Sequence, residues 1–375
     1  MKDKIALCLM VKNEEDYIAQ CIESVLEFVD TIYILDTGST DRTVDIAKNY
    51  TDKIYFKEFN NDFGYMRNYL LNFVKDEEWI LFLDADECFP KESVQTLKKL
   101  ILNYDDEVGG IRFYRYNFYS RGGWYTDHIV KMFRNKSFKY DKTVSEKIER
   151  SVVENGYRIV EPDIILNHFG RSKPRHIREK TTRNYIQLMK KEVEKNNEGL
   201  MHAYIGINSM ALGDFETALI EGKRAIDIDA SSIRSYYFYG NILRSVNKNN
   251  EAIKIFKAAL NLECGKMRAS FLNMIGVTYL SLGEYDKSRK YLYLAMDSNK
   301  SLVHININIG LTYFYEKNYK KALYFFQNAG ERNSGFLIRN KLADFEYDPF
   351  TVCSYETIHN YIGLDYYISI CKSNI

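Results

Sequence analysis

Apolar runs alternate with amphipathic stretches along the first ninety residues of the chain. Two of the runs are apolar throughout, as in strands buried on both faces of a sheet. Strands are predicted at residues 5–11, 31–35, 54–56 and 79–83. Apolar residues at the spacing of one helix face predict helices at residues 18–29, around 44–47, and at 66–74. This repeated strand–helix order predicts an α/β fold with a mostly parallel sheet and right-handed crossovers.

Two acids, Asp84 and Asp86, stand at the carboxyl end of the last of these strands. In open α/β sheets ligands bind at that edge, and two acids there repel each other unless a cation or a ligand hydroxyl engages them. A hard divalent ion that holds a diphosphate meets this need. A second Asp-x-Asp, at Asp227 and Asp229, follows a helical repeat instead, and we interpret it as solvated surface.

Polar residues follow two other predicted strands at the same edge. They are Asn13 and Glu14 after the first strand and the stretch 36–41 after the second. A nucleotide needs carboxylates or amides for its base and ribose and a metal for its phosphates. The chain has no Gly-x-Gly-x-x-Gly and no Gly-Lys-Ser/Thr loop, which argues against dinucleotide-binding and P-loop chemistry.

Composition limits the class of protein. The 375 residues are 46% hydrophobic, which is enough for real cores and argues against disorder. A net charge of +1 leaves no electrostatic footprint for nucleic acid. Six scattered cysteines without Cys-x-x-Cys spacing indicate reduced thiols, and no apolar run approaches the roughly 18 residues of a membrane span. We predict a cytoplasmic protein without nucleic-acid partners or a membrane span.

Four motifs within this region resemble family 2 glycosyltransferases of the GT-A fold. They lie at Val11–Glu15, Leu35–Val44, Asn61–Asn68 and Phe82–Glu87, in the order that the family has. The resemblance implies inverting transfer of a sugar from a nucleotide sugar, usually a UDP-sugar, with Mn²⁺ or Mg²⁺ as cofactor.

The resemblance also implies roles for individual residues. Asp86 would hold the metal, and His168, which follows a strand-like run, is a further candidate for metal or diphosphate. As alternatives, Asp36 is a simple turn carboxylate and Arg67 a surface ion pair. The implied contacts to the nucleotide sugar are Val11, Asn13, Glu14, Asp36, Arg67, Asp84 and Ala85.

The acceptor half is expected at residues 107–168, where aromatic residues such as Tyr119 and Trp124 are frequent and could stack on a sugar or peptide. Asp127 and Glu146 are the candidate catalytic bases, each with a surface carboxylate as the alternative. Glu146 is favoured because the family pattern keeps it. Many relatives have His where this chain has Ser145, so any role of that His does not carry over.

After Pro174 the chain is helical and repetitive. Small residues at Ala218, Ala252, Ser288 and Ala322 are spaced by 34, 36 and 34 positions. This period resembles tetratricopeptide repeats, which stack helical hairpins into a solenoid. Such a solenoid offers a groove for a peptide or a face for a homodimer. The predicted domains are a GT-A domain at 1–180, a helical linker at 181–200, repeats at 201–336 and a helical cap at 337–375.

The combination of the two domains resembles bacteriocin peptide S-glycosyltransferases of the sublancin type. That resemblance implies a Cys, or a Ser, of a small peptide as acceptor. One alternative is transfer to a cell-envelope glycan or lipid carrier. An alternative of another class is an inactive transferase domain that serves as a repeat-based scaffold.

Overall fold

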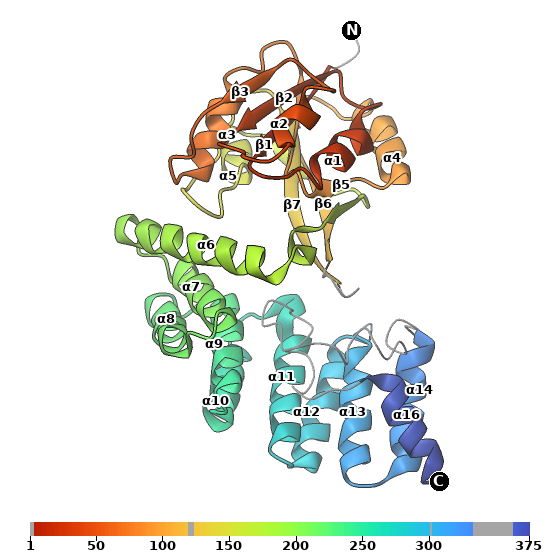
Figure 1. The fold of residues 1–375 in the computed structure, drawn as a ribbon. Coiled ribbons are helices and arrows are strands. Elements are labelled where there is room, and N and C mark those ends of the chain that lie inside the picture. The colour runs from red at the N-terminus through yellow and green to blue at the C-terminus, as the bar shows by residue number, and fades with distance from the viewer. Residues whose placement is uncertain (1–3, 119–123, 301, 333–362) are drawn as a thin grey trace. The chain divides into compact units, whose positions relative to one another are not determined.

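The computed structural model describes residues 4–118, 124–300, 302–332 and 363–375. They form two compact units, one that runs through residue 188 and one that begins at residue 189 (Figure 1). The predicted boundary at residue 180 falls inside helix α6 (Arg175–Lys195). Most of the predicted cap, residues 337–362, lies outside the described residues.

One mixed sheet forms the centre of the first unit, in the order β3-β2-β1-β4-β7-β6-β9-β5 with β8 beside β6. The strands β3, β2, β1 and β4 run parallel, and β7 joins β4 and β6 antiparallel. This confirms the α/β prediction. The strands are β1 (Ile5–Val11), β2 (Thr31–Asp36), β3 (Ile54–Phe56), β4 (Trp79–Leu83), β5 (Glu87–Cys88), β6 (Val108–Phe118), β7 (Trp124–Arg134), β8 (Arg158–Val160) and β9 (Ile165–His168).

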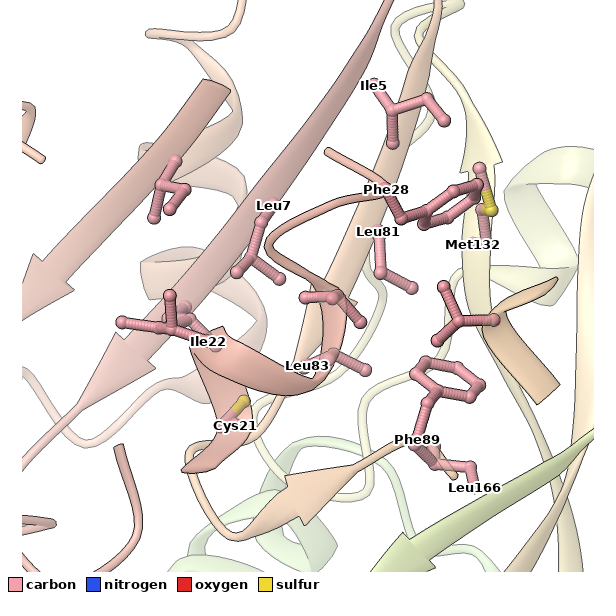
Figure 2. Close-up of a cluster of buried hydrophobic side chains, with 14 of the residues drawn as sticks. Ile5, Leu7, Cys21, Ile22, Phe28, Leu81, Leu83, Phe89, Met132 and Leu166 are labelled. Carbon is pink, nitrogen blue, oxygen red and sulfur yellow. The ribbon is translucent and has the colours of Figure 1, made fainter. Parts of the chain in front are cut away.

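Helices cover both faces of this sheet, as the unbroken apolar runs of β1 and β4 require. Alternate residues of β1 enter different cores: Leu7 packs with Ile22 of α1, and Cys8 packs with Met66 of α3. Figure 2 shows the first of these cores, with Leu7, Ile22 and Leu81 gathered between the sheet and α1. The helices are α1 (Ile18–Val25), α2 (Thr43–Ala47), α3 (Phe63–Leu71), α4 (Lys91–Ile101) and α5 (Glu149–Glu154).

Two helices differ from their predicted bounds. Helix α3 begins three residues early because Asp62 caps it, with Oδ1 accepting a hydrogen bond from Tyr65 N at 2.8 Å. Helix α1 ends at Val25, and a turn in which Phe28 N donates to Val25 O at 2.8 Å follows it. The apolar period is continued by that turn, so the pattern alone overestimates the length of the helix.

Helical hairpins make up the second unit (Figure 1). Its elements are α7 (Gly199–Ala211), α8 (Phe215–Ile228), α9 (Ile233–Ser245), α10 (Asn249–Ala259), η2 (Gly265–Met267), α11 (Arg268–Ser281), α12 (Tyr285–Ser298), α13 (His304–Tyr315), α14 (Tyr319–Arg332) and α16 (Leu364–Ser373). Helix α16 packs against α14. None of the helices in the described ranges is both long and apolar enough to cross a membrane.

The helices of each hairpin cross at small residues. The predicted positions Ala218, Ala252, Ser288 and Ala322 are all fully buried. Facing glycines recur with the same period, and at two of them a ring fills the space: a Cβ on Gly240 would lie 2.2 Å from Phe256. The facing glycines are Gly206, Gly240, Gly276 and Gly310.

Candidate active site

The loops after β1 and β2 are joined into one rim by hydrogen bonds. Asn13 has φ +56°, and its Oδ1 accepts from Thr40 N at 2.7 Å. Glu14 N donates to Thr43 Oγ1 at 2.7 Å. Because β1 and β2 are parallel neighbours, their carboxyl ends bring these two predicted loops to the same edge of the sheet.

Asp36 closes its own turn at this rim. Its Oδ1 accepts from Gly38 N and from Ser39 N, each at 3.0 Å. Gly38 has φ +105°, a conformation that a residue with a side chain adopts only with strain. The structure therefore gives Asp36 the turn role that was its alternative, and its role toward a nucleotide stays a prediction.

Asp84 is held between two buried cations. Its Oδ1 accepts from Arg67 Nη2 at 2.8 Å, and its Oδ2 accepts from Lys131 Nζ at 2.7 Å. Burial alone would raise the pKa of Asp84, but Lys131 and Arg67 outweigh it and hold that pKa well below its usual range. The side chain of Arg67 is only 9% exposed, so its ion pair is not a surface one.

The ion pairs continue beyond Lys131. Its Nζ lies 2.8 Å from Oε2 of Glu87, a fully buried acid. The other oxygen of Glu87 accepts from Arg115 Nη1 at 3.1 Å. Arg115 then donates to both oxygens of Asp127, at 2.9 and 2.7 Å, across the β6–β7 pair where the two residues lie directly opposite.

On the other side, Arg67 Nε donates to Glu146 Oε1 at 2.8 Å. A continuous series of alternating charges results, which we call the charge chain. Its members are Glu146, Arg67, Asp84, Lys131, Glu87, Arg115 and Asp127, in that order. Each buried ion has a counter-ion on either side, which is the arrangement that makes buried charge tolerable.

Both candidate bases stand at ends of the charge chain. Burial raises the pKa of Asp127, but the two hydrogen bonds from Arg115 outweigh it and bring that pKa below its ordinary value. A carboxylate with a lowered pKa is a weaker proton acceptor. Glu146 accepts one hydrogen bond from Arg67 Nε, and its role as the base stays a prediction.

Asp86 has a separate set of partners. Its Oδ2 lies 2.7 Å from Lys173 Nζ, and its Oδ1 lies 3.5 Å from His168 Nε2. His168 Nδ1 contacts Asn117 Oδ1 at 2.6 Å, so the other ring nitrogen faces Asp86. Lys173 Nζ also donates to both carboxylate oxygens of Glu14, at 2.7 and 2.8 Å. The structure thus brings the two predicted metal residues together.

Charge shifts the titration of this cluster. Burial would raise the pKa of Asp86, but His168 and Lys173 bring it well below its usual range. Burial and then the charge of Asp86 raise the pKa of Glu14 to about 7, against the opposing effect of Lys173. Burial would lower the pKa of Lys173, but the two carboxylates raise it above its ordinary value, so the ammonium stays charged.

The segment 168–173 folds closely over Asp86. Strand β9 pairs with β5, which places His168 opposite Glu87, and Phe169 N donates to Asp86 O at 2.8 Å. A Cβ on Gly170 would lie 2.6 Å from His168 Nε2 and 3.1 Å from Asp86 Oδ2. Glycine at this position is what allows the backbone to approach both side chains.

These residues fit a metal that is bound together with a substrate. A carboxylate and an imidazole are both common ligands of divalent ions, and substrate phosphates often supply further oxygens. In the part of the chain that the structure describes, no three His, Cys, Asp or Glu side chains are grouped to hold an ion. Asp86 and His168 therefore suit a metal whose coordination a diphosphate completes.

The sequence of this chain matches known protein families in both units. The Glycosyl transferase family 2 pattern matches residues 7–169, and the Tetratricopeptide repeat pattern matches residues 233–263 and 269–301. The chain carries a family 2 glycosyltransferase domain and tetratricopeptide repeats. The family 2 match begins within β1 and ends directly after β9, and the matched repeats correspond to α9–α12.

Three curated relatives place these domains among named proteins. A TPR repeat-containing protein of Synechococcus elongatus is 27% identical over 189 residues, which is 46% of this chain and 43% of that protein. The glycosyltransferase SunS of Bacillus subtilis is 38% identical over 94 residues, 24% of this chain and 22% of that protein. Glycosyltransferase GlyA of Streptococcus pneumoniae is 28% identical over 135 residues, 34% of this chain and 19% of that protein. The chain thus spans less than half the length of these relatives.

Two of the residues predicted to contact the nucleotide sugar are buried. Val11 and Ala85 are 2% and 4% exposed. Val11 O accepts from Thr37 N at 2.9 Å and from Thr37 Oγ1 at 3.0 Å, which ties β1 to the loop after β2. Of the predicted aromatic wall, Tyr119 and the side chain of Trp124 lie outside the described parts of the structure.

Sequence reasoning missed four charged residues of the transferase domain: Glu87, Arg115, Lys131 and Lys173. Glu87 stands three positions after Asp84, at the end of the Phe82–Glu87 motif, so its place in the sequence was visible but its burial and its cations were not. Lys173 carried no signal, since it stands in a charged stretch that marks the end of the domain.

Proposed function

We propose that this chain is a metal-dependent, inverting glycosyltransferase that transfers a sugar from a UDP-sugar to a Cys, or a Ser, of a small peptide such as a bacteriocin precursor. The main support is the convergence of Asn13, Glu14, Asp36 and Asp86 at one edge of the parallel strands of a family 2 domain. That edge is where open α/β sheets bind nucleotides.

For the donor, Asn13, Glu14 and Asp36 line the rim where uracil and ribose would bind. Asp86 and His168 would hold the Mn²⁺ or Mg²⁺, and the bound metal would neutralise the charge that develops on the departing diphosphate. Arg67 and Lys131 hold Asp84 ionised and fixed, which suits Asp84 as the acceptor of a hydrogen bond from a ribose or sugar hydroxyl group.

For the acceptor, inversion by a single displacement needs a base on the face of the sugar opposite the diphosphate. Glu146 is the proposed base. Arg67, which donates to both Glu146 and Asp84, would hold this base in a fixed relation to the donor site.

The repeats are proposed to bind the peptide acceptor, because stacked helical hairpins present an extended surface for chain-like partners. The homodimer through the repeats and the cytoplasmic location stay predictions. Transfer to an envelope glycan or lipid carrier, and an inactive scaffold, are the competing functions.

The test is a screen of nucleotide sugars against the full chain. With Mn²⁺ or Mg²⁺, UDP and one UDP-sugar should raise the melting temperature, and the chain should slowly hydrolyse that sugar. Mass spectrometry of a Cys-containing peptide incubated with the same donor should then show one added hexose or related unit. Hydrolysis without any peptide product would favour an envelope acceptor, and neither binding nor hydrolysis would favour the scaffold.

A further inference from the structure

A lysine ammonium occupies the place between two acids of the donor site. Lys173 Nζ lies within 2.8 Å of three carboxylate oxygens, two from Glu14 and one from Asp86. The three side chains are 15%, 19% and 12% exposed. Among the described residues, Lys173 is thus the cation that bridges both acids.

The same short segment supplies Lys173 and His168 to Asp86. The bond from Phe169 N to Asp86 O and the close approach of Gly170 fix the start of the segment. Lys173 then follows the 3-10 turn η1 (Gly170–Ser172), directly before Pro174 and α6. Its four-carbon side chain reaches the site from the edge, so the ammonium can move without a change in the sheet.

Lys131 provides a contrast within the same domain. It projects from the middle of β7 and is 4% exposed, with one oxygen each from Asp84 and Glu87 as partners. Both of those acids belong to the charge chain and have a second cation. Asp86 and Glu14 share Lys173 instead, so a divalent ion on Asp86 would leave the ammonium beside a positive charge.

We propose that Lys173 is a stand-in cation of the donor site: it neutralises Asp86 and Glu14 before the donor arrives, gives up Asp86 to the metal, and then contacts the diphosphate. This inference rests on the proposed function, because it requires a metal and a nucleoside diphosphate at Asp86. Lys173 would then weaken the binding of metal alone and strengthen the binding of metal together with diphosphate.

The test measures Mn²⁺ binding to the full chain by electron paramagnetic resonance of the free ion, with and without UDP. In Lys173→Met, Mn²⁺ alone should bind about tenfold more tightly, because the competing ammonium is gone. The factor by which UDP increases the affinity for Mn²⁺ should be smaller than in the wild type, again by about tenfold. The Mn²⁺ affinity of Lys173→Arg should lie between those of the wild type and Lys173→Met. Lys48→Met, at an exposed lysine paired with Asp45, should bind Mn²⁺ as the wild type does.

Unchanged Mn²⁺ affinity and unchanged coupling to UDP in Lys173→Met would overturn the inference. The proposed function fails differently: then the wild type itself would not bind Mn²⁺ with UDP, or Asp86→Asn would bind them as well as the wild type does. The two failures are thus distinguishable.

A second measurement uses the wild-type chain, in case Lys173→Met does not fold. Pulsed acetylation followed by mass spectrometry reports the accessibility of each lysine amine. Mn²⁺ alone should increase labelling of Lys173 several-fold, and further addition of UDP should reduce it again, while Lys48 stays constant. Labelling of Lys173 that ignores both ligands would overturn the inference.

Discussion

The two units of this chain are stabilised internally by different kinds of interaction. In the transferase domain, a chain of seven alternating charges runs through the candidate site. In the repeats, hairpins close at glycines, and Gly240, Gly276 and Gly310 each receive a side chain of the next helix. The difference shows that buried ions can position a site that must hold charged ligands. The substitution of any one of these ions is then expected to destabilise the domain.

The chain offers separate probes for the two units. Both tryptophans stand in strands of the transferase domain, and Trp79 is fully buried in β4, so its fluorescence reports on that unit. Far-ultraviolet circular dichroism is dominated by helices, most of which lie in the second unit. Unfolding followed by both probes therefore tests whether the two units respond separately.

The largest effect on stability is expected from Lys131→Met. The change leaves Glu87, which is fully buried, and Asp84 without a shared cation. Loss of one partner of a buried ion pair costs about 3–5 kcal/mol. Urea unfolding followed by fluorescence should show this loss. The control is Lys136→Met, at an exposed lysine in the turn after β7. Equal stability of the two variants would show that the charge chain does not stabilise the domain.

Asp86→Asn should reduce sugar transfer by about 10²–10³-fold, as does the removal of a group that stabilises transition-state charge. The melting temperature should stay close to that of the wild type, because Asn keeps an oxygen that can accept from Lys173 Nζ. Product formation at saturating donor is the measurement, with Asp45→Asn as an exposed control. Full turnover of Asp86→Asn, or of the wild type in excess chelator, would refute the metal role.

In the repeats, Gly240→Ala should destabilise the second unit. Alanine favours a helix over glycine by about 1 kcal/mol, but its Cβ would lie 2.2 Å from the ring of Phe256. Overpacking of this kind costs about 1–3 kcal/mol, so the net effect is a loss. The circular dichroism transition should move and the fluorescence transition should not. Lys254→Ala, on the exposed side of α10, is the control.

Acid should affect the transferase domain before the repeats. Unfolded Asp84 has the ordinary pKa of 3.8, and in the folded chain Lys131 and Arg67 hold its pKa well below that value. As pH falls past 3.8, the unfolded state binds a proton that the folded state refuses, so stability is lost. The fluorescence midpoint in urea should therefore drop between about pH 5 and pH 3. A flatter slope in Asp84→Asn would identify the group, and an unchanged slope would exclude it.

The fold could be predicted further than the site. The unbroken apolar strands and the period of 34 to 36 residues led to an α/β domain and a helical solenoid, because both depend on local patterns. The loops with Asn13, Asp36 and Asp84 were predicted to meet because carboxyl ends of parallel strands share an edge.

The partners of these residues could not be predicted in the same way. Lys131 meets Asp84 only because the antiparallel β7 packs beside β4, and Lys173 reaches Asp86 from 87 positions away in the sequence. Long-range ion pairs leave no periodic trace, so the sequence predicted repulsion between Asp84 and Asp86 where the structure has two separate sets of cations. The glycines that face the repeats' small residues did have a period, and a search for it would have found them.

The effect of removing the base depends on the acceptor, and it is smallest for a thiol. A thiol with a pKa near 8.5 is partly ionised near neutral pH, whereas a hydroxyl is not, so a Ser acceptor needs the base more than a Cys acceptor does. Glu146→Gln should therefore slow transfer to Ser by about 10²-fold, and to Cys by only a few-fold at pH 8.5. Asp127→Asn removes one of the two negative charges that pair with Arg115 and should lower both rates equally at every pH, since it acts through the charge chain. Peptides that differ only in Cys or Ser, assayed from pH 6.5 to 9, give the comparison. If Glu146→Gln also lost equal, pH-independent fractions of both rates, Glu146 would position substrates rather than accept the proton, and the charge chain would carry a structural residue at each end.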